Sequence, residues 1–309
     1  MTTQILATLT AQQRIFYVKN LLRRYTPALQ FARFATKDTV ARRQGLTVNW
    51  RRFSAMTALT TPLTEGVTPT GQSLTVTAIT AAMQQFGGFV TISDVLDFAA
   101  IDSVLTETSE LLGEQAGLTI DVLTRDVVAA GTNVVFANGT ARNQVGATDV
   151  LTTLLIRRAR RVLKRNNVPP AAGGDYIAFV HPDGVFDLTG DSAWVNAAQY
   201  AGATRIFDGE LGRLWGVRFI ETTNAPIWVA SGAGAPAADV YGTIIVGRGA
   251  YGIPELTGQS SPDIIVKQLG SAGTADPLNQ RATAGWKVAH AARRLAEEAI
   301  VRIEHGVTA

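Results

Sequence analysis

The chain has 309 residues, of which 46% are hydrophobic and 17% charged, which excludes a disordered protein and allows about two domains with buried cores. It has no cysteine, which excludes disulfide scaffolds, thiolate metal sites and cysteine nucleophiles and is typical of a protein made in a reducing cytosol. The formal charge of +3 is unevenly spread, because residues 1–52 carry ten basic groups against one acid, Asp38. This gives +9 for the segment and −6 for the remainder. A basic segment on an acidic body predicts a polyanionic partner, an acidic neighbouring subunit or a merely solvated face.

The first 45 residues are expected to form an arm. Apolar residues at roughly helical spacing predict a helix within residues 4–25 that ends before Pro27, and residues 28–45 show no clear period. We find no secretory signal at the start of the sequence and no run of about 18 apolar residues that could span a bilayer. The sequence therefore predicts a soluble, intracellular protein with no membrane partner.

Residues 46–86 are expected to form an extended β-hairpin. Leu46, Val48 and Trp50 alternate with polar residues, and Leu74 and Val76 alternate with threonines. The turn-rich tip at residues 62–72 is too long for a tight hairpin. Because an isolated two-stranded ribbon is marginally stable in water, this hairpin is expected to need a partner surface.

Two helices are expected next. Residues 94–130 show a helical apolar stripe, which predicts a spine helix of roughly 50 Å that stops near Gly131. A second helix over residues 147–167 ends before Pro169 and carries six cations in its last turns: Arg157, Arg158, Arg160, Arg161, Lys164 and Arg165. The helix dipole favours cations at a C-terminus by about 0.3–1 kcal/mol, which accounts for only part of this cluster. A phosphate-bearing ligand and the acids of a neighbour remain as alternatives.

The second half of the chain reads as a series of short strands. They are expected at residues 176–181, 217–222, 227–230, 240–246 and 263–268, with further apolar stretches at 286–291 and 299–304. Together with the two helices they predict an α+β protein with an inserted domain.

One motif suggests a cofactor. Gly247, Gly249 and Gly252 follow a predicted strand with the spacing of the dinucleotide-binding fingerprint. That site needs a helix that begins at the glycines, and Pro254 disfavours one. We therefore interpret the glycines as a structural turn with close backbone approach or positive φ.

No catalytic constellation is found in the sequence. The histidines His181, His290 and His305 stand in no metal-binding spacing, and neither a nucleophile elbow nor a P-loop occurs. The sequence predicts no catalytic, cofactor or metal site and no enzyme.

Six stretches in order resemble the major capsid proteins of tailed bacteriophages, in a podovirus-type branch. They are residues 65–72, 85–94, 181–183, 212–222, 246–252 and 280–287. The resemblance implies the α+β Johnson fold shared by tailed phages and herpesviruses. Its parts would be an N-terminal arm (1–45), an extended hairpin loop (46–86), a peripheral domain with a long spine helix (87–174), an axial domain (175–262) and a return to the peripheral domain (263–309).

The function that this resemblance implies is assembly, as hexamers and pentamers, into the icosahedral shell that encloses the phage double-stranded DNA. DNA would be bound without sequence preference, and portal, scaffold or decoration proteins would be further partners. The protein would be located in the virion capsid after assembly in the cytoplasm of the host bacterium.

The residues expected at subunit contacts lie on the hairpin and the arm: Trp50, Phe53, Glu65, Val67, Pro69, Leu74, Arg23, Arg24, Arg42 and Arg43. Arg157, Arg161 and Lys164 are expected to face either packaged DNA or acids of a neighbouring subunit.

Two alternatives remain open at this point. One is an encapsulin-like nanocompartment shell that holds a cargo enzyme. The other, more remote, is an oxidoreductase that binds a nucleotide at residues 247–252.

Overall fold

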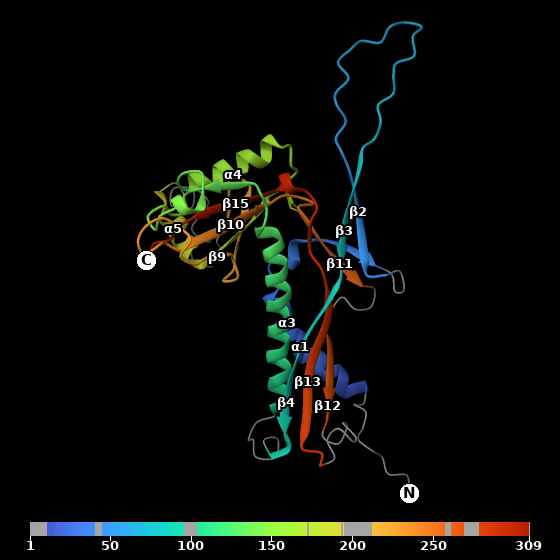
Figure 1. Ribbon diagram of the computed structural model, residues 1–309, viewed down its shortest axis with the longest axis vertical. Coiled ribbons are helices and arrows are strands. Elements are labelled where there is room, and N and C mark those ends of the chain that lie inside the picture. The colour runs from blue at the N-terminus through green and yellow to red at the C-terminus, as the bar shows by residue number, and fades with distance from the viewer. Residues whose placement is uncertain are drawn as a thin grey trace.

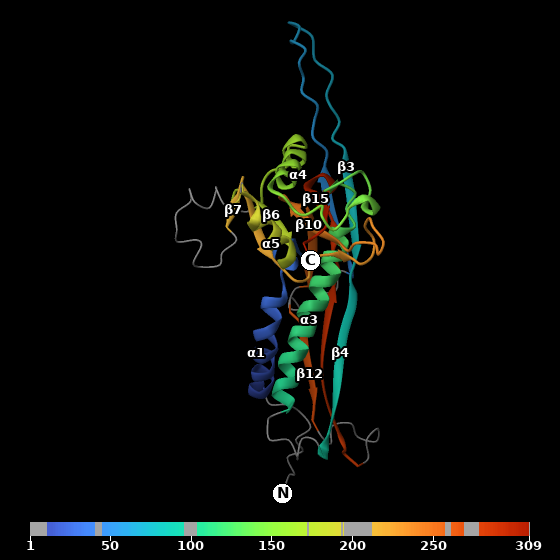
Figure 2. The ribbon, with the colours of Figure 1, turned by 90° about the vertical axis from the view of Figure 1, so that its left-hand side faces the viewer.

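The computed structural model describes residues 11–40, 45–95, 104–171, 173–192, 194, 212–256, 261–268 and 278–308. The molecule is elongated, with a hairpin projecting at one end, a helix-and-sheet body at the other and a second sheet to one side (Figure 1). Seen after a quarter turn, it is narrow (Figure 2). The mixture of helices and sheets confirms the predicted α+β class.

The elongated body is built on a three-stranded antiparallel sheet, here called the peripheral sheet. Its strands are β4 (Gln84–Ser93), β12 (Asp263–Lys267) and β13 (Arg281–His290). The helix α3 (Val104–Ala129) covers one face of this sheet. The helix buries Leu112 and Ile120 against Ala284 and Trp286 of β13. Its 26 residues extend over about 39 Å, which confirms a long helix in the expected segment, shorter than the roughly 50 Å predicted. Residues 96–103 of the expected helix lie outside the described residues.

The N-terminal segment packs on the spine of its own chain. Helix α1 (Ala11–Ala28) lies beside α3 and buries Leu21 there (Figure 2). A Cβ atom on Gly113 would overlap the carbonyl oxygen of Leu21, and one on Gly117 would lie 2.7 Å from that of Tyr25. These glycines let the two helix backbones meet. One expectation is corrected, because α1 continues through Pro27. The described part of the arm packs on its own chain, and its contact with another subunit stays a prediction.

A buried carboxylate joins this segment to two other parts of the chain. Asp121 of α3 accepts the backbone N–H groups of Gln30 at 2.9 Å, Phe31 at 2.7 Å and Ala32 at 3.3 Å. Its other oxygen accepts the side-chain amide of Asn224 at 2.8 Å. Burial raises the pKa of the Asp121 carboxyl, against these hydrogen bonds. The following elements, η1 (Ala32–Phe34) and β1 (Thr36–Val40), are thereby fixed to the spine.

The hairpin is formed as predicted. Strand β2 (Thr47–Phe53) pairs antiparallel with β3 (Val76–Ala82), with Trp50 opposite Ile79. Residues 54–75 carry no strand and project from the body (Figure 1). After Met83 the chain continues directly into β4, so the hairpin extends from the peripheral sheet.

A seven-stranded sheet, here called the axial sheet, forms the part at the side. Its order is β5-β15-β10-β6-β8-β7, with β9 paired to β10. The strands are β5 (Val134–Phe136), β6 (Tyr176–Val180), β7 (Arg213–Leu214), β8 (Val217–Glu221), β9 (Ile227–Trp228), β10 (Val240–Val246) and β15 (Ile300–His305). The flanking helices and 3-10 turns are η2 (Arg142–Gln144), α4 (Thr153–Arg165), α5 (Pro182–Gly190) and η4 (Glu297–Ala299).

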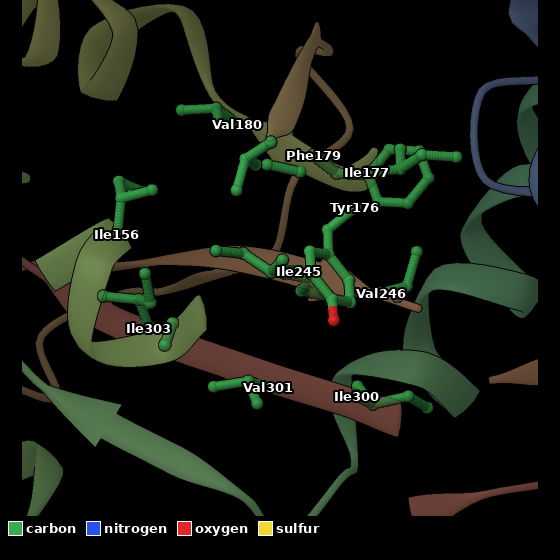
Figure 3. Close-up of a cluster of buried hydrophobic side chains, with 14 of the residues drawn as sticks. Ile156, Tyr176, Ile177, Phe179, Val180, Ile245, Val246, Ile300, Val301 and Ile303 are labelled. Atoms are coloured by element: carbon green, nitrogen blue, oxygen red, sulfur yellow. The ribbon is translucent and has the colours of Figure 1, made fainter. Parts of the chain in front are cut away.

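Helix α4 and strand β15 pack with the axial sheet, and the division of the chain into domains stays a prediction. Ile156 of α4 packs in one core with Ile245 of β10 and Ile303 of β15 (Figure 3). Strand β15 lies between β5 and β10. The expected peripheral segments 87–174 and 263–309 each therefore contribute to the axial part. These contacts join residues far apart in sequence, which local patterns do not predict.

The glycine motif is a turn, as predicted. It connects β10 to β11 (Tyr251–Leu256), which pairs with β1 and β14 (Arg293–Arg294), and no helix follows. Gly249 has φ +67°, and a Cβ atom on Gly247 would overlap the side chain of Val168. Pro254 lies beyond Tyr251 and Gly252, the two residues of β11 that pair with β14. Its missing N–H therefore costs no hydrogen bond to β14. These features contradict a nucleotide site of the dinucleotide-binding type.

Candidate subunit-contact surfaces

The hairpin tip exposes apolar side chains. Leu63 is 78% exposed, Val67 62% and Leu74 63%. Of the other residues expected here, Phe53, Glu65 and Pro69 are exposed as well. Exposed apolar residues grouped on one projection indicate a surface that another molecule covers.

The hairpin base, in contrast, is fixed to its own chain. Trp50 is half-buried and packs with Val40, Val48 and Met83. Arg52 donates from Nη1 to Glu298 Oε2 at 3.2 Å, and its Nη2 closely contacts Oε1 of the same carboxylate. Trp50 therefore attaches the hairpin to the body, and its contact with another subunit stays a prediction.

The outer face of the peripheral sheet carries an apolar notch. Phe89 of β4, Gly285 of β13 and Ile265 of β12 are direct neighbours across the three strands. Phe89 is 74% exposed and Ile265 44%, and both line a shallow cavity of about 330 Å³. The missing side chain of Gly285 lets the backbone of Phe89 approach closely. This notch could not be predicted from the sequence because it depends on the register of three separate strands. The one available signal was Phe89 after two glycines, in a strand with polar neighbours on its outer face.

The arginines of the arm have partners within the chain. Arg23 contacts Glu110 at 3.4 Å, and Arg24 contacts Glu110 at 3.1 Å and Glu114 at 3.6 Å, both acids being on α3. Arg42 and Arg43 lie outside the described residues. A role of Arg23 and Arg24 in subunit contacts therefore stays a prediction, and their observed contacts hold α1 on the spine.

The basic helix presents its cations at the surface of the axial part. Arg157, Arg161 and Lys164 are exposed and line a cavity of about 400 Å³ together with Trp215. The guanidinium carbon of Arg157 lies 5.2 Å from the centre of the Trp215 ring, within cation–π range. The cations were predicted from the sequence, whereas Trp215 was not, because the turn that joins β7 to β8 places it beside them only in the folded chain.

The histidines are held by hydrogen bonds inside the protein. His290 lies 3.2 Å from the hydroxyl of Thr124, and His305 lies 2.9 Å from that of Thr243. Burial lowers the pKa of each imidazole to about 4. Both rings are therefore neutral near pH 7.

Two searches over the described parts of the chain gave negative results. No three His, Asp or Glu side chains there are placed to hold a metal ion. No helix there has the length and apolar character needed to cross a membrane.

Comparisons with known proteins agree on one family and one fold. Residues 75–303 match a family model, Phage_capsid_4, described as phage capsid protein. The capsid of Ralstonia phage GP4 superposes with a TM-score of 0.71 at 15% identity, over 91% of this chain and 88% of that one. The capsid asymmetric unit of cyanophage Pam1 gives 0.69 at 17% identity, over 93% of both chains. A Mycobacterium phage Che8 structure gives 0.60 at 16% identity, over 98% of this chain and 95% of that one. A search among curated proteins found no match.

Proposed function

The chain belongs to the phage capsid protein family, and we propose that its subunits join into a shell by docking the hairpin tip of one subunit on the peripheral sheet of the next. It is a major capsid protein with a structural role, and its place is the virion capsid. The family match does not favour the nanocompartment alternative. A turn in place of a nucleotide site removes the basis of the oxidoreductase alternative.

The observation that carries the docking proposal is the exposed apolar tip. Burying a Leu or Val side chain contributes about 1.5–3 kcal/mol. Leu59, Leu63, Val67 and Leu74 are each more than 60% exposed, so most of that stabilisation is unused in the single subunit. A shell contact that covers them would recover it in every subunit, and symmetry would repeat the contact around the particle.

The notch on the peripheral sheet supports the choice of partner surface. Phe89 and Ile265 offer exposed apolar surface beside a shallow cavity, into which a side chain of another subunit could insert. The tip and the peripheral sheet lie at opposite ends of the molecule (Figures 1 and 2), so a tip cannot reach the notch of its own chain. The contact is therefore between subunits.

Cysteine cross-linking tests this contact, because the natural chain contains no cysteine. We expect the double variant Val67→Cys, Phe89→Cys to form a ladder of disulfide-linked oligomers when assembled particles are oxidised. A matched control pairs Val67→Cys with Phe186→Cys, since Phe186 is 71% exposed but lies on α5 of the axial part. No ladder from the first pair, or equal ladders from both, contradicts the docking proposal.

The enclosed cargo and the helper proteins are further parts of the proposal. The shell would enclose double-stranded DNA, assemble in the cytoplasm of the bacterial host and use portal, scaffold or decoration proteins. Particles purified from infected cells should contain DNA that is protected from nuclease. Particles that contain a protein and no nucleic acid would favour the nanocompartment alternative instead.

A further inference from the structure

The cations of α4 share a cavity that has no carboxylate partner for them. Five basic residues line it with Leu154 and Trp215: Arg157, Arg158, Arg160, Arg161 and Lys164. Among the ion pairs of the described residues, none includes any of these five. Elsewhere in the chain, arginines such as Arg24, Arg142 and Arg302 bind buried or half-buried carboxylates. The α4 cluster is therefore different from the structural arginines of this protein.

Arg160 is the most enclosed member of the cluster. It is half-buried, and its Nε is shielded from solvent with no hydrogen-bond partner among the described atoms. The nearby carboxylate of Asp175 already accepts a hydrogen bond from Arg213 at 3.0 Å. A shielded donor without a partner is costly, so Arg160 is kept beside the cavity at a cost to the stability of the subunit.

The spacing of the cations adds repulsion. Arg157 and Arg161, and Arg160 and Lys164, stand four residues apart on one helix, where like charges destabilise each other. The helix dipole offsets this only within the last turn, at Lys164 and Arg165. An anion held between the side chains would offset it for the whole cluster.

Trp215 is held beside the cavity by a strained turn. It forms, with Gly216, the two-residue connection between β7 and β8, and both residues have positive φ, 48° and 69°. Such turns favour Asn-Gly or Asp-Gly, because a bulky residue at positive φ is strained. The turn holds the indole next to the guanidinium of Arg157. Strain of this kind, kept at a cavity lined by cations, points to a ligand site.

We propose that this cavity binds the phosphate groups of a nucleic acid, with Trp215 against a sugar or base. Guanidinium groups match phosphate oxygens with paired hydrogen bonds, and several are available here within one small volume. A nucleic acid supplies closely spaced negative charges along one backbone. A peptide would have to bring several acidic side chains together in the same cavity. An aromatic face beside cations is also typical of nucleic-acid grooves. The inference rests on the proposed enclosure of DNA, and it selects phosphate over the acids of a neighbour.

Fluorescence anisotropy with short labelled DNA, single-stranded and duplex, tests the site, with tripolyphosphate as competitor. Arg160→Gln and Arg161→Gln should each weaken DNA binding by about tenfold, the effect of losing one charged hydrogen bond. Each should also lower the slope of log affinity against log salt by about one. The matched control is Arg165→Gln, which removes a cation from the same helix outside the cavity and should change affinity by less than about twofold.

The outcomes separate the possible ligands. Competition by tripolyphosphate together with DNA binding supports a phosphate site used by nucleic acid. Binding of tripolyphosphate without DNA assigns the same phosphate site to a free polyphosphate. An equal effect of Arg165→Gln, or tighter binding of a glutamate-rich peptide than of DNA, overturns the inference.

Two readouts keep the test independent of folding and assembly. Thermal unfolding should show that Arg161→Gln, at an exposed position, is as stable as the natural protein, so the test stands even if Arg160→Gln unfolds. Shells are scored separately by electron microscopy. Phosphate binding without shells contradicts the proposed function alone, and shells without phosphate binding contradict this inference alone.

Discussion

The replacement Glu304→Gln tests how the axial sheet is fixed to the spine. Glu304 of β15 is fully buried, and Arg142 donates to its two oxygens from Nε and Nη2, both at 2.8 Å. Arg302 donates to it from Nε, also at 2.8 Å. Arg302 continues to the end of α3, where its Nη1 binds the carbonyl oxygen of Ala129 closely and that of Gly131 at 3.1 Å. One carboxylate thus holds two guanidinium groups, one of which caps the spine helix.

The magnitude follows from the burial of Glu304 and Arg302. The amide of glutamine has the same shape, but it removes the negative charge and directs N–H donors towards a guanidinium. Removing one partner of a buried ion pair costs about 3–5 kcal/mol, because the other partner stays charged and buried. The side chain of Arg302 is only 11% exposed, so water cannot replace the lost carboxylate there. We therefore expect Glu304→Gln to lower the free energy of unfolding by about 3–5 kcal/mol.

Urea unfolding of the unassembled subunit, followed by tryptophan fluorescence, measures this loss. Glu298→Gln is the matched control, because that acid binds Arg52 at the surface and should cost less than about 1 kcal/mol. A loss below about 1 kcal/mol for Glu304→Gln, or equal losses for both variants, would refute the reasoning.

Three further predictions concern the arm, the spine and pH. Gly113→Leu should separate α1 from α3, lower the free energy of unfolding by about 1–3 kcal/mol and speed proteolysis within residues 11–28. The control Gly71→Ala, which has open space around it, should change neither the stability nor the rate of proteolysis. Asp121→Ala leaves three backbone N–H groups without their acceptor and should lower the free energy of unfolding by about 3 kcal/mol or more. The control is Asp94→Ala, whose partly exposed carboxylate accepts the N–H of the adjacent Val95, and an equal loss of stability in both variants contradicts the prediction. Because burial lowers the pKa of His290 and His305 to about 4, the unfolded chain binds more protons between pH 6.5 and 4. Stability should therefore fall as pH falls through that window, by up to about 3 kcal/mol per histidine, and an unchanged urea midpoint between pH 7 and 4.5 would show the reasoning wrong.

Local patterns predicted the elements whose neighbours lie close in sequence. The alternation around Trp50 and Val76 predicted the hairpin, whose two strands need only each other for their register. The apolar stripe before Gly131 predicted the spine, since a helix satisfies its backbone internally. Pro254 decided the glycine motif correctly because its restriction acts on the residue next to it.

Features that depend on distant pairing were missed. The cluster of Arg142, Arg302 and Glu304 is assembled only when β15 enters between β5 and β10. The attachment of α1 to its own spine had a visible signal in Gly113 and Gly117, one helical turn apart. That spacing does not say which helix fills the space, and an arm that packs on a neighbour was equally compatible with it.

Of the candidate contact surfaces, one was predicted from local sequence and others, which depend on distant contacts, were not. The hairpin tip was predicted because exposed apolar residues in a projection can be read from the sequence. The notch at Phe89, Gly285 and Ile265 could not be predicted, because it needs three strands from different parts of the chain in a defined register. The position of Trp215 could not be predicted either, because the β7–β8 hairpin and the helix α4 that it meets are far apart in sequence.

Electron microscopy of the natural protein beside a variant lacking residues 62–72 tests the central claim most directly. The deletion removes Leu63 and Val67 from the exposed tip and leaves β2, β3 and the hairpin base intact. The natural protein should form closed shells, and the variant should remain as folded, unassembled subunits with unchanged thermal unfolding. Intact shells built from the variant would contradict the account.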